Sequence, residues 1–341
     1  MWRRHQTSII IALAFIFMFS AFWLFPSLSF IIFIALLWNL LLIKPAEYLR
    51  RRTKLSSGVS AAIVLTAFII IVGGFFTIIS RTLIPSLQEF IYDLPNISSR
   101  IKSIPFIAHS PFWTGEFNSL WSDIASVSVD ALKSSLTLIL SVFSKFIDFI
   151  IIIFATFYLL GDGQQIKHWI AGLFPHPDQH RITSLINSIM YSLRIYVCSQ
   201  LTICIITAAV VFAGFEFFHL PYASVFAVLS GISEFVPVIG PTLASCFGIL
   251  LAATFSVEIA VRIAIFYFIQ TQITHNIIYP YIVGKDLHLH PLAILLGVML
   301  GGELLGPLGM FLAVPCMVIL RLVIVNIVKD LSSPEKNPPV E

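Results

Sequence analysis

The chain has 341 residues, of which 58% are apolar and only 11% are charged. About a quarter of the residues of a soluble protein are charged, so this composition excludes an ordinary cytosolic enzyme and a disordered chain. The net charge of +3 is too small for a nucleic-acid-binding surface. The mean hydropathy of +0.96 indicates that several segments cross a lipid bilayer. We therefore predict an all-α polytopic membrane protein with about eight membrane segments.

The first apolar segments, Ile9–Phe25 and Leu28–Ile43, predict two helical spans joined at Pro26. A secretory signal peptide is the alternative for the start of the chain, because arginines precede an apolar run there. No small-residue cleavage site follows and a second span starts at once, so the two-span interpretation is favoured. Three further spans are predicted at Val59–Ser80, Phe146–Leu160 and Ile195–Phe218.

The basic residues predict the orientation of these spans. Cytoplasmic loops are enriched in lysine and arginine near span ends. Arg3 and Arg4 precede the first span, and a basic loop follows the second. With both on the inside, the two chain termini are cytoplasmic, as expected for a multi-pass protein of the bacterial cytoplasmic (inner) membrane. The basic residues of the loop are Lys44, Arg50, Arg51, Arg52 and Lys54.

The segment 81–145 is then external and contains a predicted amphipathic helix that starts near Phe117. Its apolar residues recur at three- and four-residue steps, which is the pattern of one helix face. We expect prolines, Pro85 and Pro95 among them, to break the preceding chain into short pieces. The amphipathic helix could lie on the membrane surface, pack against a neighbouring subunit or cover the bundle. Its apolar residues are Phe117, Leu120, Trp121, Ile124, Val127, Ala131 and Leu132.

A later apolar stretch, Tyr222–Phe255, is interrupted near its middle by Pro237, Gly240 and Pro241. Each half is shorter than the roughly 20 residues of a full crossing. Because proline removes a helical hydrogen bond and clashes with the preceding turn, we predict that the chain enters the membrane, breaks and turns back. Short tilted helices with proline turns among the lipid headgroups are the alternative.

A second stretch, Pro291–Val328, has the same arrangement of apolar flanks around a glycine-rich break. One full span, Val257–Tyr279, separates the two stretches, so the second hairpin enters from the opposite face. Paired interrupted segments of opposite sense are typical of an inverted repeat with a substrate site near the membrane midplane. The break residues are Gly301, Gly302, Gly306 and Pro307.

The last third of the chain carries motifs of a known family. The segments are Phe235-Val-Pro-Val-Ile-Gly-Pro241, Gln272–Pro280, Gly284–Pro291 and Gly301–Pro315. In order and spacing they resemble the autoinducer-2 exporter family, also called the PerM permease family. The resemblance implies an elevator-type transporter of a small polar molecule that works as a homo-oligomer, a pentamer in relatives. It also implies that the chain needs no cofactor.

Two glutamates are candidate substrate or ion ligands, because ionisable residues within membrane segments are costly and usually functional. Glu303 lies at the glycine-rich break of the second hairpin, where backbone groups can approach a ligand. Its alternative is a glutamate at the interface that accepts bonds from helix-start amides. Glu234 lies one turn before Pro237. Its alternative is a structural partner for a basic residue such as Arg262.

Polar residues of the span between the hairpins form the second group of candidates. Gln272 and Asn276 are four residues apart and share one helix face. Neutral donors and acceptors there suit a polyhydroxylated substrate, or else they form hydrogen bonds between helices. Thr274 stands where the family pattern commonly has an acidic residue. If that acidic residue carries a coupling proton or cation in relatives, this chain must use Glu303, Glu234 or His275 instead, or lack coupling. His275 alone is more typical of a structural histidine.

Three functions remain open on these grounds. The first is a secondary transporter that exports a small polar molecule such as autoinducer-2. The second is a monovalent cation/proton antiporter. This function needs a titratable carboxylate at the site, so threonine at position 274 is unfavourable for it. The third is a membrane scaffold that does not transport, but a scaffold would not need broken hairpins at membrane depth. No catalytic motif or metal-ligand spacing occurs in the chain, so we do not expect an enzyme or a metal site.

These observations divide the chain into five predicted parts. Spans one to three are followed by the external segment, by spans four and five with a cytoplasmic loop at 161–194, by a transport unit holding both hairpins, and by a polar tail. We expect Gly161-Asp-Gly163 and His176-Pro-Asp178 to form turns in that loop. The five parts are 1–80, 81–145, 146–218, 219–328 and 329–341.

Overall fold

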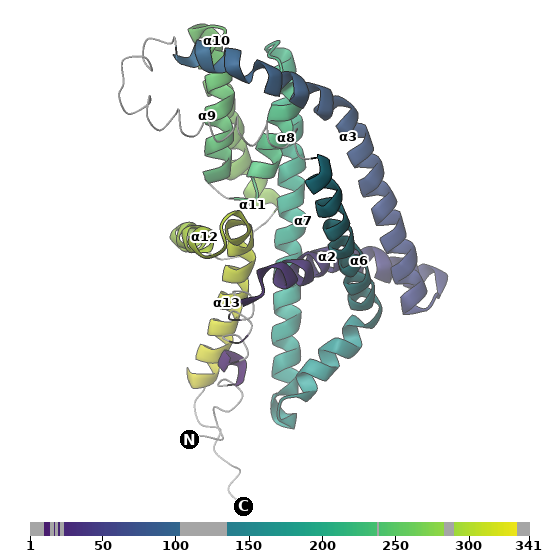
Figure 1. Cartoon of the computed structure of the whole chain (residues 1–341). Coiled ribbons are helices and arrows are strands. Elements are labelled where there is room, and N and C mark those ends of the chain that lie inside the picture. Colours follow the sequence, from purple (N-terminus) through teal and green to yellow (C-terminus); the bar gives the residue numbers. More distant parts are fainter. Residues whose placement is uncertain are drawn as a thin grey trace, which may run out of the picture. The chain divides into compact units, whose positions relative to one another are not determined.

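The computed structural model describes residues 10–13, 17, 20, 24–102, 135–236, 239–282 and 290–332. Within these ranges the chain is helical and contains no strand (Figure 1). Six of the described helices are long and apolar enough to cross a bilayer. The chain is an all-α multi-pass membrane protein, which confirms the prediction from composition. The amphipathic helix predicted from Phe117 lies outside the described residues.

The chain forms two compact units. The first unit comprises Met1–Ala67, Asp148–Cys198 and Lys285–Glu341, and the second comprises Phe68–Ile147 and Ser199–Gly284. The first hairpin of the predicted transport unit thus belongs to the second unit, and the second hairpin belongs to the first. The boundaries predicted for the five parts remain a prediction.

The first unit is built on α2 (Pro26–Thr53), which begins at the predicted Pro26. Proline is favoured at the first helical position, where its missing N–H has no helical partner to lose. Ala35 of α2 packs with Ile152 of α6 (Ser135–Gly172). Beside them the Thr156 hydroxyl donates a 2.7 Å hydrogen bond to the Ile152 carbonyl within α6.

The same unit contains the start of α7 (Gln179–Phe217), together with α12 (Pro291–Leu305) and α13 (Pro307–Ser332). Arg181 of α7 donates to the side-chain and backbone oxygens of Asn326 on α13, both at 2.9 Å. Helices α12 and α13 pack against each other as the second hairpin.

Two breaks expected from the sequence are wrong. Helix α3 (Ser57–Lys102) continues through Pro85 and Pro95. Both prolines are exposed, and Ile97 and Ile101 beyond them are buried in the core of the second unit. Burial of these side chains offsets the lost hydrogen bonds, and a long helix accommodates proline by bending.

The turn expected at Gly161-Asp-Gly163 is also wrong, because α6 runs through it to Gly172. Glycine inside a helix costs only about 1 kcal/mol, which the long helix tolerates. The turn lies later, where a short 3-10 helix, η2 (His176–Asp178), connects α6 to α7. The turn expected at His176-Pro-Asp178 is thereby confirmed.

The second unit is formed by the rest of α7 with α8 (Ala223–Ser233), α9 (Ile239–Ala253) and α10 (Val257–Ile273). Helix α9 packs against both α8 and α10. In the core, the Phe215 ring stacks on Phe226 with centroids 4.9 Å apart, and Tyr267 meets Phe215 edge-on at 6.3 Å. The Tyr222 hydroxyl donates a 2.5 Å bond to Asp93, which ties α3 to the start of α8.

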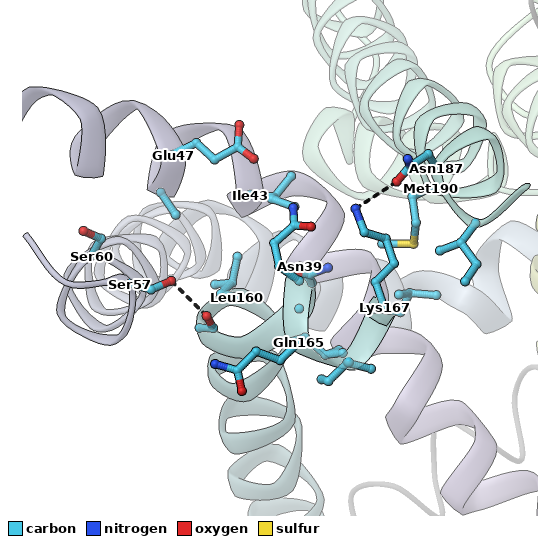
Figure 2. Close-up of a pocket in the computed structure, with 18 of the residues that line it drawn as sticks. Asn39, Ile43, Glu47, Ser57, Ser60, Leu160, Gln165, Lys167, Asn187 and Met190 are labelled. Atoms are coloured by element: carbon cyan, nitrogen blue, oxygen red, sulfur yellow. Dashed lines mark hydrogen bonds between the residues drawn. The ribbon is translucent and has the colours of Figure 1, made fainter. Parts of the chain in front are cut away.

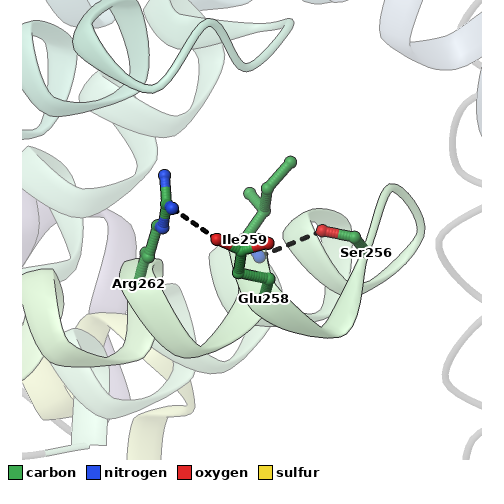
Figure 3. Close-up of polar contacts among 4 residues, drawn as sticks. All are labelled: Ser256, Glu258, Ile259 and Arg262. Carbon is green, nitrogen blue, oxygen red and sulfur yellow. Dashed lines mark hydrogen bonds and ion pairs between the residues drawn. The ribbon is translucent and has the colours of Figure 1, made fainter.

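Helix α10 begins at a well-formed N-cap (Figure 3). The Ser256 hydroxyl accepts a 3.1 Å bond from the Ile259 amide, which satisfies one of the free donors of the first turn. Glu258 lies in the same turn and pairs with Arg262, and both side chains are largely exposed. A negative charge at this end also interacts favourably with the helix dipole.

Both predicted hairpins are interrupted where proline and glycine cluster. Helices α8 and α9 have 11 and 15 residues, both shorter than the roughly 20 residues of a crossing. In the second hairpin, α12 has 15 residues, whereas α13 has 26. The two hairpins therefore differ in the length of their second arm, because α13 continues through Pro315.

Candidate functional site

A buried polar network surrounds Glu234 in the second unit. Glu234 follows the last residue of α8, and only 4% of its surface is exposed. Its carboxylate accepts a 3.0 Å bond from the Thr207 hydroxyl of α7. Its backbone carbonyl accepts a 2.7 Å bond from the side-chain amide of Gln200, which lies about two turns before Thr207 on α7. A carboxyl group is thus held at the hairpin break by neutral partners.

Side chains from α10 and the segment after it extend this network. The Gln270 amide donates to Thr274 at 3.1 Å and to Thr207 at 3.4 Å. The Tyr279 hydroxyl donates a 3.0 Å bond to the side-chain oxygen of Gln200. Gln200, Thr207, Gln270 and Thr274 are all at most 8% exposed. Buried polar groups linked in this way define one arrangement of the helices, since a missing partner is costly.

The network is completed by a π-helical segment. Residues Thr274–Ile278 form η3, in which the Tyr279 amide bonds the Thr274 carbonyl five residues earlier. The short helix α11 (Tyr279–Ile282) follows directly. A π-helical turn inserts an extra residue into a helix and occurs often at functional sites. Here it lies where Thr274, His275 and Tyr279 meet the network.

A cavity of about 470 Å³ lies beside this network, between the start of α9 and the α10–η3 segment. Its wall combines hydroxyl groups with apolar and aromatic surface. This mixture suits a small solute that needs several hydrogen bonds and an apolar support. The lining residues are Pro241, Thr242, Ser245, Ile249, Ala264, Tyr267, Phe268, Thr271 and His275.

Among the predicted site residues, the structure brings Glu234 and Thr274 into the network and His275 into the cavity wall. The His275 ring also stacks on Tyr279, with centroids 5.7 Å apart. Gln272 and Asn276 share a face as expected and are joined by a 2.6 Å hydrogen bond, but both are exposed. Glu303 is exposed on α12, in the first unit.

The alternative that Glu234 pairs with Arg262 is wrong. Arg262 forms its ion pair with Glu258, four residues away on the same helix (Figure 3). The i to i+4 spacing brings these two side chains together without any tertiary contact. Glu234 instead bonds the hydroxyl of Thr207.

Two glycines at the breaks occupy positions where a side chain is disfavoured. Gly240 is buried in the first turn of α9, where a Cβ atom would overlap the Ser233 carbonyl oxygen. Gly306 ends α12 with a φ of +63°, a conformation that strongly favours glycine. Pro241 follows in α9, Gly301 and Gly302 lie in α12, and Pro307 begins α13. Pro237 lies outside the described residues.

Four residues of the network were missed from the sequence: Gln200, Thr207, Gln270 and Tyr279. Gln200 and Thr207 lie seven residues apart in an apolar span, which is two helical turns, so they lie near one face. Two polar residues on one face of an apolar span were the signal in the sequence that could have indicated a buried polar contact. Their partner Glu234 lies on another helix, and the sequence alone does not show that they meet.

A model of the AI-2E family transporter matches residues 10–329, nearly the whole chain, including both hairpins and the network. The chain belongs to the AI-2E family of transporters. This confirms the resemblance seen in the motifs of its last third.

Relatives of this AI-2E family member include three candidate transport proteins. YrrI of Bacillus subtilis is 32% identical over 176 residues, which cover 52% of this chain and 50% of YrrI. YueF of Bacillus subtilis is 26% identical over 249 residues, 70% of this chain and 68% of YueF. MT0215 of Mycobacterium tuberculosis is 24% identical over 298 residues, 83% of this chain and 78% of MT0215. The match to YrrI thus spans half of that protein's length.

Proposed function

We propose that this AI-2E family member is a secondary transporter that exports a small, hydroxyl-rich molecule of the autoinducer-2 type. The observation that carries the proposal is the cavity of about 470 Å³ beside the buried Glu234 network. Its volume lies within the range of small-molecule sites. The family assignment supports transport as the activity.

The chemistry of the cavity wall favours a polyhydroxylated solute. Thr242, Ser245 and Thr271 carry hydroxyls that both donate and accept hydrogen bonds, and His275 adds a ring nitrogen. Phe268 offers an apolar face for the carbon skeleton. A solute with several hydroxyl groups exchanges its bonds to water for bonds to these groups.

The position of the cavity at a hairpin break supports a binding site at membrane depth. Irregular backbone there is tolerated only when it is buried in protein or lines a cavity. Pro241 and Thr242, just after the break, belong to the cavity wall. We propose that the predicted transport part of the sequence, 219–328, changes its access between the two membrane faces by an elevator-type movement.

Flux measurements in proteoliposomes test this function. Vesicles with purified protein are loaded with labelled autoinducer-2, and release is compared with that from protein-free vesicles and from vesicles loaded with labelled ribose.

We expect Thr271→Val to slow release severalfold, because one hydroxyl of the site is lost at nearly equal volume. Thr254→Val is the matched control, since the Thr254 hydroxyl bonds the Leu251 carbonyl and does not line the cavity. Release equal to that of protein-free vesicles overturns the proposal.

A second candidate function is monovalent cation/proton antiport, which is favoured by the burial of Glu234. A buried carboxylate whose hydrogen-bond donors are neutral can bind a cation or a proton. The same vesicles, loaded with a pH-sensitive dye and exposed to a sodium or potassium gradient, separate the two functions. A pH change that depends on Glu234, without release of autoinducer-2, supports antiport.

We propose further that the transporter works in the bacterial cytoplasmic membrane with both termini inside, as a homo-oligomer. A pentamer is the number that the family resemblance implies. The basic residues of the last turn of α2, Arg50, Arg51 and Arg52, support this orientation.

A further inference from the structure

A second pocket lies in the first unit and shares no lining residue with the cavity described above. It has a volume of about 460 Å³ and is bounded by α2, the start of α3, the end of α6 and the start of α7. Figure 2 shows Asn39, Glu47 and Lys167 among its labelled wall residues. All of the lining residues belong to the first unit.

The wall of this pocket changes from apolar to charged along two helices. On α2, Leu36 and Ile43 precede Glu47 and Arg50. The spacing of three and four residues places these side chains on one helix face. On α6, leucines at 159 and 160 precede Gln164, Gln165 and Lys167. The pocket is therefore amphiphilic, with its charged end toward the basic last turn of α2.

Two buried polar atoms of the wall have no hydrogen-bond partner among the described residues. They are the side-chain oxygen of Asn39 and the hydroxyl of Ser60, whose residues are only 3% and 2% exposed. Nearly all buried polar groups in proteins are hydrogen-bonded, so an exception points to a missing partner. The Asn39 oxygen is an acceptor, and its missing partner must carry an N–H or O–H group.

Cationic groups stand at the charged end of the same pocket. Lys167 donates a 3.1 Å bond to the side-chain oxygen of Asn187 (Figure 2). Asn187 is neutral, so this contact does not compensate the positive charge of Lys167. Arg50 contributes a guanidinium, which suits the geometry of phosphate oxygens. Because Glu47 adds a carboxylate at the same end, a ligand for this pocket needs an anionic group beside a cationic one, a hydrogen-bond donor and an apolar part.

We propose that the pocket binds a phospholipid of the cytoplasmic leaflet. Its phosphate lies at Arg50 and Lys167, a headgroup hydroxyl or ammonium donates to Asn39, and its acyl chains follow the apolar end. Basic pockets between membrane helices on the cytoplasmic side are typical sites for lipid headgroups. The apolar half of the wall favours a lipid over a free phosphoester, which shares only the headgroup chemistry.

Native mass spectrometry of the purified full-length protein tests this site. The protein is titrated with phosphatidylethanolamine and phosphatidylcholine of identical acyl chains. Both headgroups have the same net charge, but choline has no N–H donor. We expect phosphatidylethanolamine to bind roughly three- to tenfold more tightly, the range for one hydrogen bond to a buried acceptor. Equal binding of the two lipids, or no bound lipid at all, overturns the proposal.

Variants separate this pocket from general attraction to a basic surface. Asn39→Leu removes the acceptor and should abolish the preference between the two lipids. Lys167→Gln should weaken both lipids several-fold, and it keeps the proposal testable if the Asn39 variant does not fold. Lys44→Gln is the matched control, because Lys44 is another basic residue of α2 but does not line the pocket.

Two further outcomes also overturn the assignment. The first is an equal loss of lipid binding in Lys44→Gln and Lys167→Gln, which would mean that the basic surface as a whole attracts lipid. The second is displacement of the lipid by an equimolar amount of soluble glycerol phosphate, which would identify the ligand as a free phosphoester.

Discussion

The hydroxyl of Tyr279 donates a 3.0 Å hydrogen bond to the side-chain oxygen of Gln200, which links the residue after the π-helical turn to α7. The two residues are 79 positions apart in the chain. Gln200 in turn donates to the backbone carbonyl of Glu234 at the first hairpin break. A single glutamine therefore joins the π-helical segment to the break.

Tyr279→Phe should destabilise the folded protein by roughly 1 kcal/mol or more, because the Gln200 oxygen loses its donor. We also expect slower transport, since the π-helical segment loses its tie to α7. Thermal unfolding in lipid nanodiscs and flux in proteoliposomes measure the two effects. Tyr281→Phe is the matched control, because Tyr281 lies two residues away and is 89% exposed. Equal effects of the two substitutions would contradict the role given to this bond.

Gly240→Ala should force α8 and α9 apart at the break, because the new Cβ atom overlaps the Ser233 carbonyl oxygen. We expect a lower melting temperature and loss of flux. Gly74→Ala serves as the control. Apart from the backbone of its own helix, no atom of the described residues lies within 4 Å of the new Cβ, and alanine favours a helix over glycine by about 1 kcal/mol. A Gly240 variant as stable as the Gly74 variant would show that the close contact is unimportant.

Glu234→Gln should disturb coupled transport more than Glu303→Gln does. Glu234 is buried in the polar network, whereas Glu303 is exposed on α12. Glutamine keeps the size of the side chain but cannot take up a proton at neutral pH. Flux is measured with and without a pH gradient, and the gradient should accelerate only the wild type and the Glu303 variant. The reverse ranking would return the coupling role to Glu303, the stronger candidate on sequence grounds.

The two hairpin tips should be reachable from opposite sides of the membrane, as an inverted repeat requires. Single cysteines at Val236 and Leu304, in a background without the native cysteines, report this by reaction with impermeant reagents. These positions avoid Gly240, where a side chain overlaps backbone, and Gly306, whose φ is +63°. Labelling of both tips from one face only, in every condition, would exclude the inverted-repeat arrangement.

Subunit contacts should involve the N-terminal helices, Ile9–Ile43, rather than the hairpin tips. Ile32 on α2 is 54% exposed, so a cysteine there should form cross-linked oligomers in native membranes. A cysteine at Ala35, which is fully buried, should not. A monomer in mild detergent and in nanodiscs would argue against an oligomer. Cross-links concentrated at Val236 would shift the contact surface to the hairpins.

The sequence by itself determined the fold class and the family, and it located the apolar helices found among the described residues. These follow from local properties: the length of apolar runs, proline at the start of α2, and the proline and glycine clusters at Pro241 and Gly306. Each of these acts within a few residues along the chain, so it can be recognised without a structure. The family motifs are likewise contiguous.

Only the tertiary structure decided which polar residues meet. Gln200, Glu234 and Tyr279 come from three separate helical segments and become a network only when these segments pack. It also decided that α3 continues through Pro85 and Pro95, because burial of residues further along the helix outweighs the local cost of proline. Local propensities are small energies, and packing of the bundle overrides them.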